Sequence, residues 1–350
     1  MSAVVAGAPG PSRARADAPS DPVGFSAEVV PDKTTGWDII VLRYRDKDVA
    51  GQGMEVRVAS NAGSNLFSWK VDGVELLTQP QQLGDLKDQR AGTPLMFPTV
   101  NRVRDAHMVF EGREFSFEAN SATNFIHGLA RRRPFQVGKV EAKGAQAATA
   151  ELFLDWDEKQ PDFSRFPIKH RLTLSYTLRK ASLQIGYRVD NQDSAKLPFG
   201  FGLHPYFHIP DRREDVTVMA PADTRMEAID FLPTGKLLPV AKTAYDLRAA
   251  KPLAGLALDD VYLGMTPDKT AAFTLAGSGL RVQLGGSADF THLVVYTPPD
   301  KPFFCIENQT SSTDAHNLYA QGKKREAHLQ VVAPGKKASG AVTWTIRRRR

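Results

Sequence analysis

The sequence predicts an all-β protein built as one large antiparallel β-sandwich. Apolar and polar residues alternate along many short segments, which is the pattern of strands with one buried face. Turn-forming residues separate these segments, and no apolar pattern of helical period extends beyond a few turns. Strands do not alternate with helices, so a parallel α/β sheet is not expected. With 350 residues the chain is long for a sandwich, and additional strands must extend its sheets.

The first segment, residues 1–24, is rich in Ala, Pro, Ser and Gly and has too few large apolar residues to build a core. We predict that it is disordered and that one β-sandwich domain spans residues 25–346. The sequence Ala14-Arg15-Ala16 resembles a signal-peptidase site, but the apolar run before it is too short for an export signal. We therefore predict a cytoplasmic protein, with the periplasm as the alternative if residues 1–24 are a truncated signal. No segment is long enough to cross a membrane.

Two hairpins stand out among the predicted strands. Asp72-Gly73 lies between two short apolar runs, a typical hairpin turn. Every second residue is apolar in 172–178 and again in 183–189, with a turn predicted at 179–181. Further strands are predicted at 37–44, 54–60, 150–156, 215–220, 280–285, 292–297, 303–308 and 341–346.

The charge and cysteine content exclude several classes of function. The net charge is +6, but the basic residues are scattered and no basic stripe carries interleaved aromatics, so we predict no nucleic-acid partner. The densest basic runs are 131–133 and 347–350, and the second is predicted to be a solvated tail. Cys305 is the only cysteine, which rules out an intramolecular disulfide, and we predict that it is a small buried hydrophobe.

The segment FGFGLHPYFHIP (199–210) contains two histidines but no cofactor loop. Its Gly-Phe-Gly lacks the third glycine of a dinucleotide site. His204 and His208 are four residues apart, which suits a metal on a helix, but Pro205 disfavours helical geometry. In an extended chain His204, Tyr206 and His208 point the same way, and a metal would still need a third ligand. We therefore predict no metal site and no cofactor.

His204 and Glu307 are suited to acid–base chemistry. A histidine titrates near neutral pH and can donate a proton as a general acid. Glu307 follows four apolar residues, and a carboxylate at the end of an apolar strand can have a raised pKa and act as a base. A glutamate at a strand end is also commonly just solvated, so its position alone does not decide between these roles.

Five segments together resemble the aldose 1-epimerase (galactose mutarotase-like) family. They follow the order found in that family and extend over most of residues 25–346, which makes the combination more specific than His-Pro-Tyr-Phe alone. The segments are PTVNRVRD (98–105), NFIHGLARRRPF (124–135), LHPYF (203–207), LDDVYL (258–263) and CIENQTSSTDAHN (305–317). The resemblance implies a β-supersandwich with a sugar site on an open concave sheet face.

The resemblance also implies roles for six residues. His204 would be the general acid and Glu307 the general base, poised near neutral pH on opposite sides of the sugar. His127 would orient the sugar near its ring oxygen. The hydroxyl-binding residues would be Asn101, Arg102 and Asp259. The implied reaction interconverts the α and β anomers of a free aldose by ring opening and closure, without metal or nucleotide.

Each binding assignment has a plainer alternative. His127 would otherwise be a hydrogen-bonded core histidine, and Arg102 and Arg104 surface partners of Asp105. Only one of two adjacent aspartates in a strand can face the sugar; the resemblance selects Asp259 over Asp260. Tyr206 is expected to pack in the core or to stack on the sugar, and His208 to be structural.

Two departures from the family pattern leave the sugar open. Members that convert galactose have a glutamine two residues before a Tyr-Thr pair, where this chain has Val294. Residues 131–133 hold more arginine than a neutral sugar requires, although in an extended segment at most Arg131 and Arg133 converge. The alternatives are a hexose-6-phosphate 1-epimerase and a non-catalytic carbohydrate-binding protein on the same fold. The predicted partner is a small-molecule sugar bound by a monomer or dimer, with no membrane partner.

Overall fold

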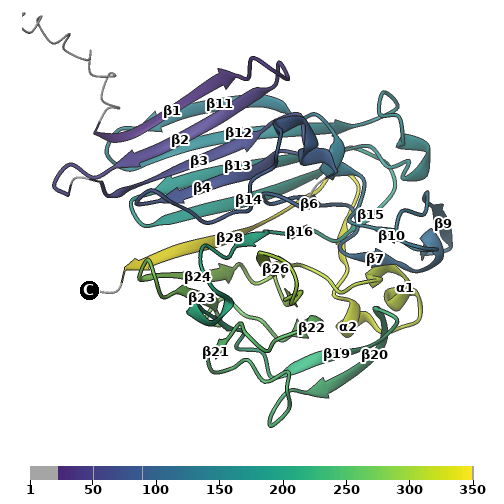
Figure 1. Ribbon diagram of the computed structural model, residues 1–350. Helices are drawn as coiled ribbons and strands as arrows, with labels where there is room; N and C mark the ends of the chain where they lie inside the picture. Colours follow the sequence, from purple (N-terminus) through teal and green to yellow (C-terminus); the bar gives the residue numbers. More distant parts are fainter. Residues whose placement is uncertain (1–22, 50, 89, 349–350) are drawn as a thin grey trace, which may run out of the picture.

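The computed structural model describes residues 23–49, 51–88 and 90–348. Nearly all of the segment predicted to be disordered (1–24) and the last two arginines lie outside these residues, while the first strand begins at Gly24. All pairings between named strands are antiparallel, which confirms the predicted all-β class (Figure 1). Three sheets of five, nine and eight strands make up most of the molecule.

The five-stranded sheet is formed by the start of the chain in sequence order. Its last two strands are joined by the predicted hairpin turn at Asp72-Gly73, where both residues have left-handed backbone angles (φ 50° and 84°). Its strands are β1 (Gly24–Pro31), β2 (Asp38–Arg45), β3 (Gly53–Ala59), β4 (Asn65–Val71) and β5 (Val74–Glu75).

The nine-stranded sheet runs through the whole molecule. The predicted hairpin at residues 172–189 is confirmed, with Arg179 opposite Ser182 at its turn. The C-terminal strand continues to Arg348, so the predicted boundary at 346 is too short. Residues 347 and 348 belong to that strand and not to a solvated tail. In spatial order the strands are β11 (Gln136–Lys143), β12 (Ala147–Trp156), β13 (His170–Arg179), β14 (Ser182–Asn191), β28 (Lys337–Arg348), β24 (Leu280–Gly286), β23 (Ala271–Leu275), β18 (Val216–Met219) and β21 (Lys251–Pro252).

The eight-stranded sheet contains the predicted strands at 292–297 and 303–308. Both are almost completely buried. In spatial order its strands are β20 (Leu232–Pro239), β19 (Thr224–Ile229), β22 (Asp259–Leu263), β25 (His292–Tyr296), β26 (Phe303–Gln309), β16 (Gly202–Leu203) and β6 (Leu95–Met96), with β17 (Phe207–His208) also paired to β26.

Short elements surround one end of this sheet. The two-stranded pairs are β7 (Arg102–Val103) with β10 (Phe125–Ile126), β8 (His107–Phe110) with β9 (Arg113–Ser116), and β15 (Leu197–Phe199) with β27 (Gln330–Val332). The α-helices are α1 (Ala315–Ala320) and α2 (Lys324–Ala327). Short 3-10 helices cover Leu83–Lys87, Arg104–Ala106, Ala130–Arg132, Phe163–Arg165 and Arg213–Asp215. Within the described part of the chain, no helix has both the length and the apolar character that a membrane span requires.

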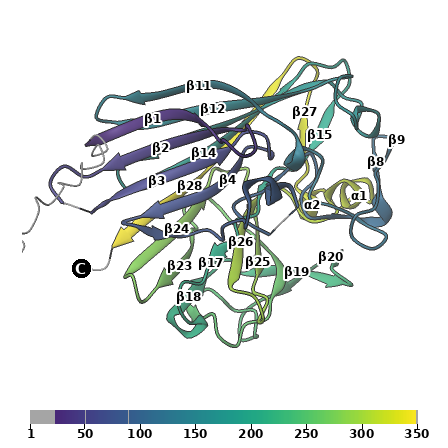
Figure 2. The same ribbon diagram turned by 45° about the horizontal axis from the view of Figure 1, so that its top comes forward.

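The five-stranded sheet lies against the β11–β14 part of the nine-stranded sheet (Figures 1 and 2). Large aromatic side chains pack in the core between the sheets. Trp69 of β4 stacks on Trp344 of β28 with ring centroids 5.3 Å apart, which joins the five- and nine-stranded sheets. Phe273 of β23 contacts Phe207 and Phe304, which joins the nine- and eight-stranded sheets. Because side chains alternate along β26, the neighbours of Phe304 on that strand face away from this core. That outer face of the eight-stranded sheet is where Glu307 and Gln309 of β26 lie.

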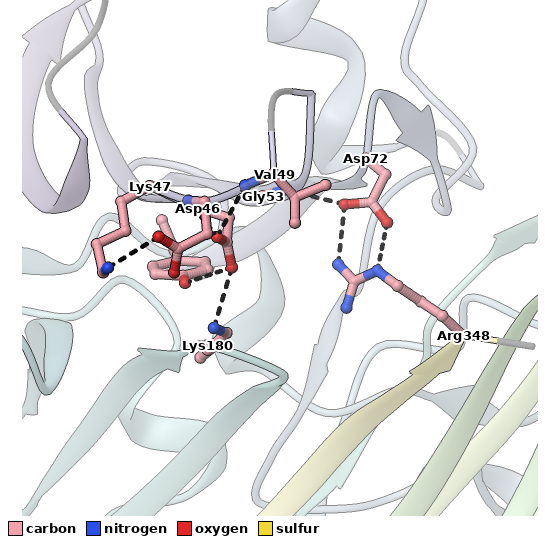
Figure 3. Close-up of polar contacts among 9 residues, drawn as sticks. Asp46, Lys47, Val49, Gly53, Asp72, Lys180 and Arg348 are labelled. Carbon is pink, nitrogen blue, oxygen red and sulfur yellow. Dashed lines mark hydrogen bonds and ion pairs between the residues drawn. The ribbon is translucent and has the colours of Figure 1, made fainter. Parts of the chain in front are cut away.

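A polar contact also ties the C-terminal strand to the first sheet (Figure 3). The Arg348 guanidinium donates Nε and Nη2 to the two carboxylate oxygens of Asp72, at 2.5 and 2.8 Å. Asp72 Oδ1 also accepts a hydrogen bond from the Gly53 N–H at 2.9 Å. The side chains of Asp72 and Arg348 are 23% and 30% exposed, so the pair is partly shielded from water and salt.

Asp72→Asn should lower the free energy of unfolding by about 1–2 kcal/mol, because Arg348 loses a two-pronged charged partner while Asn still tolerates the turn geometry. Asp48→Asn is the matched control: its ion pair with Lys47 is largely exposed, so a change below about 0.5 kcal/mol is expected. Urea denaturation of both variants measures the difference. Equal stability of the two variants would contradict the structural role of the Asp72–Arg348 pair.

Candidate active site

The six predicted site residues lie together in one pocket, although they come from positions up to 206 residues apart in the sequence, from Asn101 to Glu307. The pocket is lined by Arg90, Asn101, Arg102, Ile126, His127, His204, Tyr206, Asp259, Tyr296 and Glu307. Sequence reasoning did not identify Arg90, Ile126 or Tyr296.

Strand β26 supplies the carboxylate at the base of the pocket. Cys305, Glu307 and Gln309 are alternate residues of this strand and share the face opposite Phe304. Glu307 is 2% exposed, and its Oε2 accepts a hydrogen bond from Gln309 Nε2 at 2.9 Å. The same alternation along the sequence would have identified Gln309 as a neighbour of Glu307.

His204 directly follows β16, which pairs with β26, and this places its ring against Glu307. The distance from His204 Nε2 to Glu307 Oε1 is 3.3 Å. The ring also stacks on Tyr206, with centroids 4.5 Å apart and an angle of 22° between the planes. The acid and base are therefore in contact, and the expectation that they lie on opposite sides of a sugar is wrong for this structure. His208 is on β17 and does not line the pocket.

The small β7–β10 sheet positions the residues on one wall. Asn101 precedes β7 and His127 follows β10; both have left-handed backbone angles (φ 45° and 69°), and the His127 N–H donates to the Asn101 carbonyl at 2.9 Å. Gly128 must be glycine, because a Cβ there would lie 2.3 Å from the Phe97 carbonyl oxygen. The His127 ring therefore points into the pocket, with its centroid 4.9 Å from that of His204.

Arg102 of β7 and Asp259 of β22 also line the pocket. The Arg102 guanidinium donates Nη1 to Asn101 Oδ1 at 3.2 Å and lies over the Phe231 ring. Asp259 of β22 lines the pocket, whereas Asp260 points the other way and pairs with Arg225 at 3.1 Å. This is the orientation expected for the two aspartates.

Three arginines near the pocket form ion pairs that the sequence did not predict. Arg104 lies 3.7 Å from Asp314 and is not paired with Asp105. Residues 130–132 form a 3-10 helix, so the assumption of an extended segment at 131–133 is wrong. Arg133 forms an ion pair with Asp162, and Arg132 one with Asp88, while all three arginines line one hollow that does not include the six predicted site residues.

Burial shifts the acid–base pair away from the near-neutral values expected. Burial, and next the charge of Asp259, raise the pKa of Glu307 well above its usual range. Burial, followed by the nearby charges of Arg131 and Arg90, lowers the pKa of His204 to about 3. Burial of the pair therefore favours an uncharged imidazole and a protonated carboxyl.

Cys305 completes a cluster that sequence reasoning did not find. A ring nitrogen of His204, the Cys305 sulfur and a Glu307 oxygen lie within 4.8 Å of one another, close enough for three ligands of one cation. Burial, and next the charge of Glu307, raise the pKa of the Cys305 thiol well above its usual value. The Cys305 sulfur is therefore expected to keep its proton beside His204 and Glu307.

Known proteins match the chain across this site. The family model described as aldose 1-epimerase matches residues 49–344. A galactose mutarotase of Homo sapiens is 28% identical over 171 residues, 47% of this chain and 47% of the relative. A maltose epimerase of Levilactobacillus brevis is 28% identical over 151 residues, 42% of this chain and 44% of the relative. These matches thus span less than half the length of the curated relatives.

Solved structures show the same fold. A galactose mutarotase-like protein from Clostridium acetobutylicum superposes with a TM-score of 0.79 at 21% identity, covering 93% of this chain and 99% of that chain. A galactose 1-epimerase from Lactobacillus acidophilus gives 0.74 at 19% identity, covering 93% and 100%. At these identities the likeness establishes the fold, which confirms the predicted supersandwich.

Glu307→Gln should stabilise the fold, increasingly so at higher pH. The folded-state pKa of Glu307 is raised, so as pH increases the unfolded chain releases this proton first and the wild type loses stability until the folded pKa is reached. Glutamine does not ionise. The stability gained by the substitution, measured by urea denaturation, should therefore grow by about 1.4 kcal/mol or more between pH 5 and pH 8.

The control for this measurement is Glu118→Gln, at a glutamate whose side chain is 83% exposed. It should change stability by less than about 0.5 kcal/mol at either pH. If Glu307→Gln changes the free energy of unfolding equally at both pH values, the pKa of Glu307 is not raised in the folded protein.

Proposed function

Because the chain belongs to the aldose 1-epimerase family, we propose that it interconverts the α and β anomers of a free aldose by acid–base opening and closure of the sugar ring, without a cofactor. The observation that carries this proposal is the contact between His204 Nε2 and Glu307 Oε1, 3.3 Å apart in a pocket lined by hydrogen-bonding side chains. A protein that only binds sugar does not require a buried acid and base in contact.

Ring opening needs two proton transfers at neighbouring oxygens. Glu307 accepts the proton of the anomeric hydroxyl, the electrons left on that oxygen form the C1 carbonyl, and the bond from C1 to the ring oxygen breaks. His204 donates a proton to the ring oxygen as this bond breaks. Both oxygens are bonded to C1, so the acid and base must lie close together, in line with their short separation. Rotation about C1–C2 and closure from the other face, with both roles reversed, gives the other anomer.

The pair needs one proton in total. Ring opening starts from a protonated His204 and an ionised Glu307, and it ends with a neutral imidazole and a protonated carboxyl. Burial favours the second state, because it disfavours both charges. The proton moves from one group to the other through the sugar, and ring closure returns it. The catalytic requirement is therefore that the pair keeps its single proton.

The remaining residues would hold the sugar in place. Arg102 offers a planar fork to vicinal hydroxyls, Asp259 accepts a hydroxyl proton, and Asn101 lies beside Arg102. His127, next to His204, would bind near the ring oxygen. The main rival is a hexose-6-phosphate 1-epimerase, which would use the excess arginine. The ion pairs of Arg132 and Arg133 weigh against a phosphate-binding cluster formed by residues 131–133.

His204→Asn and Glu307→Gln should each reduce anomer interconversion about a hundredfold or more, because each removes one end of the proton transfer. Polarimetry of freshly dissolved α-anomers measures this, with circular dichroism to show that the variants are folded. Near-normal turnover in a folded variant of either kind would refute the proposed acid–base pair.

The pH dependence of kcat/KM should be flat between pH 7 and pH 5. Activity is lost on the acid side only where the pair takes up a second proton, and the pKa of His204 is lowered to about 3. On the alkaline side activity is lost where the raised pKa of Glu307 is passed and the pair has no proton left. A half-maximal loss near pH 6.5 would instead indicate an ordinary, solvated histidine.

Substitution of the adjacent aspartates should separate binding from folding. Asp259→Ala should raise KM by about tenfold, because a hydroxyl acceptor is lost while the proton path remains. Asp260→Ala should leave KM nearly unchanged but lower the free energy of unfolding by about 1–3 kcal/mol, because Arg225 is left without its partner. Steady-state kinetics and urea denaturation of both variants test this, and a reversed pattern would place Asp260 in the sugar site.

A further inference from the structure

The pocket has more positive charge than its proposed chemistry uses. Arg90 and Arg102 line it. Arg131, four residues after His127, lines a neighbouring hollow together with Gly128 and Leu129. Among the described residues, Arg90 and Arg131 have no carboxylate within ion-pair distance. The nearby acids already have partners: Asp88 pairs with Arg132 at 2.6 Å, and Asp300 with Lys301 at 2.8 Å.

These two arginines lie on the histidine side of the pocket. The Tyr206 N–H donates to the Gly92 carbonyl at 2.9 Å and the His204 N–H to the Pro94 carbonyl at 3.0 Å, so the segment that follows Arg90 runs beside the His204 segment. The charges of Arg90 and Arg131 act on His127, His204 and Tyr206. Arg102 acts on His127 as well, and also on Asp259 and Glu307. Arg90 is exposed and lines the pocket together with Tyr206 and Tyr296. Two guanidinium groups without partners therefore flank the imidazole that is the proposed proton donor to the ring oxygen.

The chemistry of the reaction indicates which part of a sugar meets these arginines. The ring oxygen is bonded to C1 and C5. With the C1 oxygen held at Glu307 and the ring oxygen at His204, the group carried by C5 extends from the histidine side. A guanidinium binds a carboxylate with two parallel, charge-assisted hydrogen bonds and has no comparable partner in a hydroxymethyl group.

We propose, on the basis of the function proposed above, that the substrate is a hexuronate, a free aldose with a carboxylate on C5, and that Arg90 and Arg131 bind this carboxylate. A carboxylate attached directly to C5 carries one charge and suits two guanidinium groups close to the ring. A phosphate ester extends one carbon and one oxygen further and carries up to two charges. The arginine best placed to add to this pair, Arg133, is held by Asp162.

The test compares kcat/KM for anomer interconversion of galacturonate, glucuronate, galactose, glucose and glucose 6-phosphate. The wild type should prefer a uronate over the matching neutral hexose by about tenfold or more. Arg90→Gln and Arg131→Gln should each lower the uronate-to-hexose ratio by about tenfold, mainly through KM for the uronate. Arg90 is the safer of the two for folding, because its side chain is exposed at the rim.

The control is Arg132→Gln, at an exposed arginine that lines the hollow of Arg131 but not the pocket and is paired with Asp88, which should leave the ratio within about twofold. Higher efficiency on the neutral hexoses or on glucose 6-phosphate would overturn the inference while leaving an active epimerase. An unchanged ratio in both arginine variants would also overturn it. Absence of turnover on every sugar would refute the proposed function itself, and the inference with it.

Discussion

The site depends on burying two ionisable side chains against each other. Glu307 and His204 are 2% and 6% exposed, and neither can carry a charge there without losing the hydration it has in water. The 3.3 Å contact allows one proton to satisfy both groups, and Gln309 donates to the carboxylate oxygen that faces away from His204. Under the proposed function, this single proton would pass from one group to the other through the sugar and return on ring closure.

The supersandwich holds this pair because β26 is buried on both faces. On one face Phe304 and Ile306 pack into the apolar core, and on the other Glu307 lines the pocket with Cys305 and Gln309 beside it on the strand. The pocket walls come from short segments with left-handed residues, Asn101 and His127, whose backbone is held by the β7–β10 pair. Rigid strands thus fix the acid–base pair, while strained loops present the side chains that would bind the sugar.

Local patterns predicted the strands well because period-two alternation reflects burial directly. The hairpin at β13–β14, the Asp72-Gly73 turn and the outward orientation of Asp260 all follow from alternation and turn chemistry. What the sequence could not predict depends on contacts between distant segments. Arg348 looked like part of a free tail because its partner, Asp72, is 276 residues away. Arg90 has no motif around it, and only the folded chain brings it to the pocket rim.

The conformation of residues 131–133 was predicted wrongly for the same reason. The side chains of three consecutive arginines point in alternating directions only if the segment is extended. Here residues 130–132 form a 3-10 turn, and the three arginines differ in their ion-pair partners. Two of them find carboxylates, and Arg131 alone remains near the histidines. The acid–base pair is set by family motifs, whereas the unpaired charge beside it is set by which surface acids happen to be within reach. Short motifs therefore identify the acid–base pair, while the ion pairs around the pocket decide which arginines are left without a carboxylate partner among the described residues.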